Sequence, residues 1–254
     1  MPNLLSQLLD SHDRLYGLVC RDLTDVDVEL MANLGYHFAW IDLEHATMAP
    51  EKVVRLSRSL ANQGIVPLVR IPELSRALVQ VLLDDGVHIL TLPDVRSAQQ
   101  VAEFVALGMY PPLGRRGVSS TTVRTGYTLG DDTAATLASM NASTNLMAMI
   151  ESDEGYEALD QILMVEGCQM MTFGYQDWCA DSGLFGEPAR VHIRPKADQL
   201  VSRSAKAGKT VTTVVSTPEE ADHYAGLGAR MFLVGVDISM KRQALADRIG
   251  QFPG

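Results

Sequence analysis

Short runs of apolar residues recur along the chain, separated by longer segments with apolar residues at every third or fourth position. Runs of this kind are typical of parallel strands buried on both faces, and the spaced segments are typical of helices packed on one side. We interpret as strands residues 15–20, 37–42, 66–71, 88–92, 146–150, 170–173, 210–214 and 231–234. The clearest helical segments are 25–34, 50–60 and 96–106. The chain is therefore expected to alternate strand and helix.

Eight strands with intervening helices in about 250 residues match the size of a (β/α)8 barrel. A doubly wound open sheet is the alternative, but it usually carries a glycine-rich phosphate turn after its first strand. Here the first predicted strand is followed by Arg21-Asp22-Leu23-Thr24. We therefore expect an α/β fold, one TIM barrel domain over residues 1–254. Residues 108–130 interrupt the alternation, and so long a stretch predicts a functional loop or a disordered segment.

Glycines before several predicted strands indicate helix ends that need a left-handed residue. They are Gly35, Gly64, Gly86, Gly167, Gly208 and Gly228.

Composition narrows the class of protein. The apolar fraction of 46% supports a large core, and the net charge of -10 disfavours a nucleic-acid partner. The cysteines, Cys20, Cys168 and Cys179, have no metal-ligand spacing and indicate a reducing compartment. No apolar run reaches the roughly 18 residues of a membrane span, and residues 1–13 lack a secretory pattern. We expect a cytoplasmic protein without a membrane partner.

Polar residues gather where the predicted strands end. The second strand ends in Asp42, Glu44 and His45, the third in Arg70 and the fifth in Glu151. The sixth strand runs through Gly174 to Asp177, and Asp237 follows the eighth. Because the active site of a (β/α)8 barrel lies at the carboxyl ends of its strands, these side chains are expected to meet there.

Glu151 and Asp177 come from neighbouring strands, and neither has a basic residue beside it in sequence. Two carboxylates with open coordination positions suit an octahedral cation such as Mg²⁺ or Mn²⁺. The alternative is that each acid caps a helix or occupies its first turn. Both interpretations remain open from the residues alone.

Arg70 carries a planar fork that suits a carboxylate or an enolate oxygen, or else a structural ion pair with a neighbouring acid. His45, in acidic surroundings, suits proton transfer near neutral pH. The methionines of the fifth and sixth strands are interpreted as core, and Cys179 as inert. The other histidines are interpreted as structural: His12, His37, His88, His192 and His223.

Taken in order, these pieces resemble the HpcH/HpaI-type class II (metal-dependent) pyruvate aldolases. The resemblance extends from Gly17 to Asp237, and the Tyr-Pro-Pro-x-Gly-x-Arg-Gly element is its most specific motif. The matching pieces are Ile41-Asp42-Leu43-Glu44-His45, Pro67-Leu68-Val69-Arg70, Leu83-Asp84-Asp85-Gly86, Tyr110-Pro111-Pro112-Leu113-Gly114-Arg115-Arg116-Gly117, Met149-Ile150-Glu151, Leu159-Asp160-Gln161-Ile162, Gly174 through Asp177, and Val234-Gly235-Val236-Asp237.

The resemblance implies that Glu151 and Asp177 bind a divalent metal, Mg²⁺ or Mn²⁺ with Co²⁺ as a further candidate. It implies that Arg70 steadies the enolate of pyruvate, that His45 is the acid and base, and that Asp42 and Asp84 orient it or relay protons. The implied partners are a 2-keto acid, an aldehyde and further copies of the chain. The implied assembly is a hexamer, a trimer of dimers, whose last helix is exchanged between partners.

One segment departs from the family pattern. Relatives usually have Gly-Pro-Ala-Asp-Leu-Ser where this chain has Gly174-Tyr175-Gln176-Asp177-Trp178-Cys179. That loop contacts the keto acid in relatives, so Gly174, Tyr175, Gln176 and Trp178 are expected to bind substrate together with Arg70. The larger side chains would shrink the pocket, add stacking surface or pack outward, and the sequence leaves these outcomes open.

Three functions follow from this resemblance. The leading one is a metal-dependent carbon–carbon lyase (aldolase) that cleaves or forms 4-hydroxy-2-keto acids through a pyruvate enolate. The second uses the same site to decarboxylate oxaloacetate or to condense the enolate with an unusual electrophile. The third is an inactive relative that binds a keto acid. The full set of His45, Arg70, Asp84, Glu151 and Asp177 disfavours the third.

Asp84 is a special case among these residues. It follows an apolar helical segment and precedes Gly86, so it is expected at a helix end on the amino side of the next strand. That side is opposite the chain's own strand mouths. We therefore expect Asp84 to serve the site of a neighbouring subunit, with a hydrogen bond to the loop before the fourth strand as the alternative.

Overall fold

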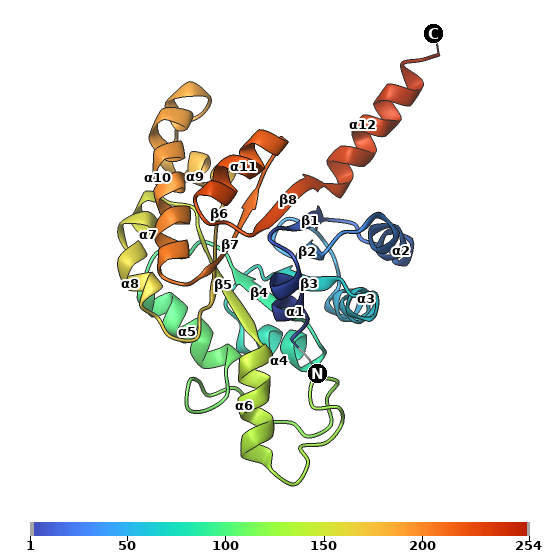
Figure 1. Ribbon diagram of the computed structural model, residues 1–254, viewed down its shortest axis with the longest axis vertical. Helices are drawn as coiled ribbons and strands as arrows, with labels where there is room; N and C mark the ends of the chain where they lie inside the picture. Colours follow the sequence, from blue (N-terminus) through green and yellow to red (C-terminus); the bar gives the residue numbers. More distant parts are fainter. Residues whose placement is uncertain (1–2, 253–254) are drawn as a thin grey trace.

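Eight parallel strands close into a barrel in the order β1 to β8 in the computed structural model, which describes residues 3–252 (Figure 1). The strands are β1 (Leu15–Cys20), β2 (Phe38–Asp42), β3 (Val66–Arg70), β4 (Ile89–Leu92), β5 (Asn145–Ile150), β6 (Met170–Phe173), β7 (Thr210–Val214) and β8 (Met231–Val236). Each lies within two residues of its predicted bounds. The predicted (β/α)8 barrel is confirmed.

Helices surround the barrel. They are α1 (Leu4–Ser11), α2 (Asp25–Leu34), α3 (Pro50–Asn62), α4 (Arg76–Asp84), α5 (Ala98–Gly108), α6 (Thr133–Ser143), α7 (Asp153–Glu157), α8 (Leu159–Leu163), α9 (Tyr175–Ser182), α10 (Glu187–Lys206), α11 (Pro218–Gly226) and α12 (Asp237–Ile249). The predicted helices correspond to α2, α3 and α5. The six glycines predicted at helix ends all have positive φ, from +76° at Gly208 to +104° at Gly228.

Two apolar layers hold the barrel together, because alternate strand residues face its centre or its helices. The inner layer includes Leu15, Phe38, Leu68 and Met147, and Leu5 of α1 joins it. The outer layer packs the strands against the helices. The inner layer is tight, since a Cβ atom at Gly17 would lie 2.6 Å from the ring of Phe38.

Two segments lie outside the regular alternation. Residues 109–132 form a long loop between α5 and α6, as the sequence predicts, and the loop buries Arg116 and Arg124. Helix α12 buries none of its residues and extends away from the barrel (Figure 1). Across residues 3–252, no helix is both long and apolar enough to cross a membrane.

Candidate active site

The residues of the candidate site occupy inward-facing positions at the carboxyl ends of the strands. On β2, Phe38 and Trp40 belong to the inner layer, and the next inward position is Asp42. On β3 the corresponding position is Arg70, and directly after β5 it is Glu151. Asp42 and Arg70 are also paired in the register of β2 and β3. The alternation of side chains along a strand therefore brings these residues to one end of the barrel.

Arg70 and Asp42 form a buried two-pronged ion pair. Nε of Arg70 donates to Oδ1 of Asp42 at 3.0 Å, and Nη2 donates to Oδ2 at 2.7 Å. The backbone N–H groups of Glu44 and His45 also donate to Oδ1, at 3.1 and 3.3 Å. Burial acts to raise the pKa of Asp42, but these hydrogen bonds and the charge of Arg70 outweigh it and lower that pKa. The ion pair that the sequence left open for Arg70 is therefore present.

The remaining nitrogen of Arg70 faces other acids. Nη1 lies 2.7 Å from Oε2 of Glu44 and 4.0 Å from Oδ2 of Asp177. Nε2 of His45 lies 3.9 Å from the same oxygen of Asp177 and 4.0 Å from Oε2 of Glu44. The side chains of His45 and Asp177 are 42% and 46% exposed, so a ligand can reach both. Four predicted site residues, His45, Arg70, Asp42 and Asp177, are therefore clustered.

Glu151 completes this cluster with one satisfied and one free carboxylate oxygen. Its Oε1 accepts a 2.7 Å hydrogen bond from the backbone N–H of Asp94. Its Oε2 is buried and has no hydrogen-bond partner among the described residues. Burial raises the pKa of Glu151 to about 8, and the charges of Asp177 and Glu44 add to the shift. The charge of Arg70 and the hydrogen bond from Asp94 oppose the shift without cancelling it, so Glu151 becomes a stable carboxylate only when further positive charge is nearby.

Gly174 explains how that carboxylate is accommodated. A Cβ atom at this position would lie 2.1 Å from Oε2 of Glu151. Only glycine therefore leaves room for the Glu151 side chain beside the end of β6. Gly174 is one of the predicted substrate-binding residues, and its backbone remains partly accessible.

Glu151 and Asp177 fit a divalent cation. The free Oε2 of Glu151 and the exposed carboxylate of Asp177 are hard oxygen donors, which Mg²⁺ and Mn²⁺ prefer. Within residues 3–252, no three His, Cys, Asp or Glu side chains form a complete set of metal ligands. Two carboxylates therefore suit a cation that also takes water and substrate oxygens.

Residues 174–179, which differ from the family pattern, form the start of helix α9. Tyr175 is half-buried and Gln176 is exposed, whereas Trp178 is fully buried. The indole of Trp178 packs beside Tyr156, with ring centroids 5.9 Å apart, and its N–H donates to Asp153. Its ring is therefore closed to a ligand, so of the outcomes that the sequence left open this side chain packs away from the pocket.

Asp84 lies apart from the strand mouths, as its position in the sequence predicts. It is the last residue of α4, which leads into the amino end of β4. Its carboxylate accepts hydrogen bonds from Gln80 (2.8 Å) and from Arg116 of the long loop. In the part of the chain that the structure describes, no hydrogen bond or ion pair joins Asp84 to His45 or Asp42.

One residue of the mouth is absent from the sequence-based site. Arg21 follows β1, and its Nε lies 3.6 Å from Oδ2 of Asp42. Counting inward positions from Leu15 and Val19 to residue 21 would have found it.

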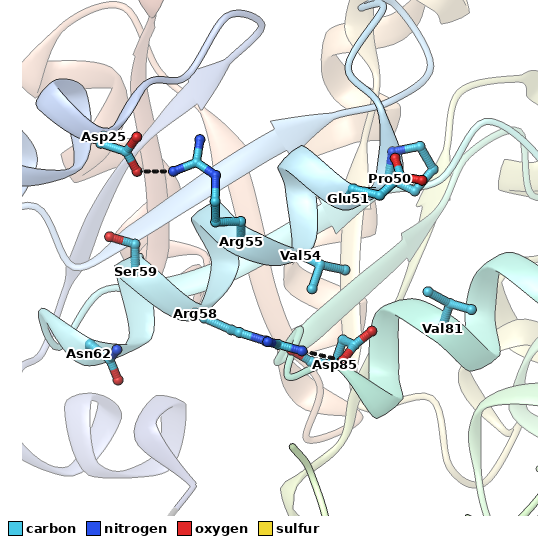
Figure 2. A pocket seen from close by; sticks show the side chains of 10 residues that line it. All are labelled: Asp25, Pro50, Glu51, Val54, Arg55, Arg58, Ser59, Asn62, Val81 and Asp85. Atoms are coloured by element: carbon cyan, nitrogen blue, oxygen red, sulfur yellow. Dashed lines mark hydrogen bonds and ion pairs between the residues drawn. The ribbon is translucent and has the colours of Figure 1, made fainter. Parts of the chain in front are cut away.

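The large cavity of about 560 Å³ shown in Figure 2 lies away from this site, on the outer surface beside α3. It is crossed by the ion pairs Arg55–Asp25 and Arg58–Asp85, and no strand-end residue lines it.

Comparisons with known proteins identify the family of the chain. A family model described as HpcH/HpaI aldolase/citrate lyase matches residues 27–244. A 2-keto-3-deoxy-L-rhamnonate aldolase of Salmonella gallinarum is 30% identical over 252 residues, 99% of this chain and 94% of that protein. A hydroxypyruvate/pyruvate aldolase of Delftia acidovorans is 30% identical over 238 residues, 94% of this chain and 88% of that protein.

A solved structure agrees with them as well. The crystal structure of an HpcH/HpaI aldolase from Desulfitobacterium hafniense matches with a TM-score of 0.88 at 29% identity, covering 98% of each chain. Because the family model spans most of the chain, the resemblance found in the sequence is confirmed. The chain belongs to the HpcH/HpaI aldolase/citrate lyase family.

Proposed function

We propose that the protein is a metal-dependent aldolase that cleaves or forms 4-hydroxy-2-keto acids through a pyruvate enolate. The observation that carries the proposal is the buried Oε2 of Glu151, which has no hydrogen-bond partner within residues 3–252 and lies in one cluster with Asp177 and Arg70. Carboxylates arranged in this way repel each other unless a cation lies between them. The aldolase names of the two relatives support the same chemistry.

Glu151 and Asp177 would hold the divalent cation. When bound, the cation supplies a Lewis acid that stabilises negative charge on the keto oxygen of the substrate. Nη1 of Arg70 faces the same space and would stabilise that charge with a directed hydrogen bond. The pair with Asp42 fixes the guanidinium, so little reorganisation is needed as the charge develops.

His45 would move the proton. In the cleavage direction its Nε2 accepts the proton of the C4 hydroxyl, the C3–C4 bond breaks, and the electron pair passes into the enolate. A proton then returns to C3 to give pyruvate, while the aldehyde leaves. The carboxylates of Glu44 and Asp177 lie 4.0 and 3.9 Å from Nε2, so the imidazole has acidic groups on both sides during the transfer.

Oligomerisation is part of the proposal. Helix α12 exposes Ile238 (44%), Leu245 (63%) and Ile249 (71%), an apolar surface that a lone subunit does not cover. We infer that this helix packs on a neighbouring subunit within a hexamer. Asp84 would then act in the neighbour's site, since within its own chain it lies at the opposite face of the barrel.

The experiment that tests the function is an assay with chelator-treated protein, with and without Mn²⁺ or Mg²⁺. The substrates are a 4-hydroxy-2-keto acid and oxaloacetate. Metal-dependent release of pyruvate and aldehyde from the hydroxy acid is the expected result. Turnover of oxaloacetate alone would favour the decarboxylase instead, and turnover of neither would favour a binding protein.

A further inference from the structure

Arg21 is a second guanidinium at the mouth of the barrel. Its position continues the inward-facing series of β1, in which Leu15 and Val19 belong to the inner layer. Its backbone is held in place because the N–H groups of Arg21 and Asp22 both donate to Oδ2 of Asp237, at 2.9 and 3.0 Å. The segment is therefore anchored, and the side chain extends toward the strand mouths.

The charge of Arg21 has no acid of its own. Its nearest carboxylate oxygen is Oδ2 of Asp42 at 3.6 Å, and that oxygen already accepts a 2.7 Å hydrogen bond from Arg70. Of the neighbouring acids, Asp22 contacts Lys52 at 3.4 Å and Asp237 is engaged by backbone N–H groups. Within residues 3–252 the guanidinium of Arg21 makes no hydrogen bond, and its side chain is 41% exposed. Its donors are therefore available to a ligand.

The position of Arg21 in the circle of barrel strands indicates a different role from that of Arg70. The groups assigned to the keto acid come from β3, β5 and β6, whereas Arg21 comes from β1, beside β8 and β2. Between β6 and β1 the mouth offers apolar side chains. Val214 is 53% exposed and paired in register with inward-facing Leu233, and Val236 packs against the inner layer. A substrate that reaches from the cation across this side meets an apolar stretch and then a cation.

We propose that Arg21 binds a carboxylate at the far end of the aldehyde portion of the substrate, so that the preferred aldehydes are acidic. The inference rests on the proposed aldolase function and deepens it. A guanidinium fork matches a carboxylate in geometry as well as charge. Arg21 is thus a specificity-determining residue, separate from the groups that act on the keto acid.

The test compares two aldehydes that differ in one charge, 4-oxobutanoate and its methyl ester, each with pyruvate and Mn²⁺. The quantity measured is the ratio of kcat/KM for the acid to that for the ester. The wild type is expected to prefer the acid, and Arg21→Met is expected to lower the ratio roughly 10- to 100-fold, as for a lost charge-assisted hydrogen bond. Arg21→Lys should retain part of the preference.

Lys52→Met is the matched control, because it removes the same charge from a nearby residue whose contact is Asp22. Its ratio should equal that of the wild type. An Arg21→Met ratio equal to the wild-type ratio, or an equal fall in Lys52→Met, would overturn the inference. Wild-type exchange of pyruvate protons with solvent, measured without aldehyde, tests the aldolase function separately. If exchange occurs without a preference for the acid, only the role of Arg21 fails; if exchange is absent, both proposals fail.

Discussion

The indole N–H of Trp178 donates a 2.9 Å hydrogen bond to Oδ1 of Asp153. Trp178 directly follows Asp177, and Asp153 lies two residues after Glu151. The contact therefore ties together the two segments that carry the proposed metal ligands. From α10, Lys196 and His192 hold the same Asp153 carboxylate at 2.8 and 2.7 Å. These contacts, led by the hydrogen bonds from Lys196, His192 and Trp178, lower the pKa of Asp153 to about 2 despite the opposing effect of burial.

Replacing Trp178 by Phe is expected to weaken metal binding while leaving turnover at saturating metal close to that of the wild type. The change keeps an aromatic ring but removes the N–H that positions Asp153. Loss of an outer partner of this kind lowers metal affinity by about tenfold or more. Mn²⁺ titration followed by electron paramagnetic resonance measures the affinity directly. Tyr156→Phe is the control, since its hydroxyl bonds to Gln199 instead. A Trp178→Phe protein with wild-type Mn²⁺ affinity would show that the contact is only structural.

Arg70→Lys keeps the positive charge but cannot reproduce the two hydrogen bonds to Asp42 or the fixed position of Nη1. We expect exchange of pyruvate protons with solvent to fall by about 100-fold, as when a directed donor to a developing oxyanion is removed. Proton NMR in deuterium oxide follows the exchange. Arg55→Lys at the outer surface, which pairs with Asp25, should exchange like the wild type. If Arg70→Lys also exchanges pyruvate protons like the wild type, Arg70 has only the structural role of pairing with Asp42.

His88 makes folding stability depend on pH. Burial lowers its pKa to about 4, and the charge of Arg124 adds to the shift, so the folded protein keeps the ring neutral where the unfolded chain protonates it. The stabilisation is complete above pH 6.5 and is lost as the pH falls from 6.5 toward 4, by up to about 3 kcal/mol. Urea unfolding between pH 7 and pH 4 measures this loss. His88→Gln should lose less stability over that range, whereas His12→Gln, at an exposed position, should behave as the wild type does. Equal losses in His88→Gln and the wild type would refute the assignment.

Mixing inactive His45→Ala and Asp84→Ala proteins tests whether Asp84 serves a neighbouring subunit. Under conditions that let subunits exchange, about a quarter of the sites would combine an intact His45 with a neighbour's intact Asp84. Recovered activity is the expected result. Mass spectrometry of the mixed oligomers verifies the exchange. No recovery despite exchange would indicate that Asp84 only holds the long loop through Arg116.

The barrel could be predicted from the sequence because its strands are buried on both faces. The apolar run of β6, which is buried throughout, carries this signal locally, and its bounds match the prediction. Asp42, Arg70 and Glu151 were predictable for a related reason, since a polar residue at the end of such a run needs a partner or a ligand. Helices α1 and α6 lie outside the repeating strand and helix units and were not among the predicted segments.

The remaining features depend on contacts between distant parts of the chain. Trp178 packs in the outer apolar layer and donates a hydrogen bond to Asp153, 25 residues earlier, and no local pattern reveals either contact. The contact of Arg21 with Asp42 requires two neighbouring strands to end at the same level. Helix α12 extends from the end of β8 with none of its residues buried, which its composition does not reveal. The sequence therefore predicted which polar residues lie at the barrel mouth better than it predicted the groups that each of them contacts.

The central claim is that Glu151 and Asp177 hold the cation on which enolate formation depends. The most direct measurement is exchange of the methyl protons of pyruvate in deuterium oxide, using chelator-treated wild type, Glu151→Gln and Asp177→Asn, with Mn²⁺ added in steps. Both variants keep the size of the side chain and remove its charge. The account predicts exchange that appears with Mn²⁺ in the wild type and is lost in both variants at the same Mn²⁺ concentrations. Exchange in the wild type without any metal, or wild-type exchange in Glu151→Gln, would contradict it.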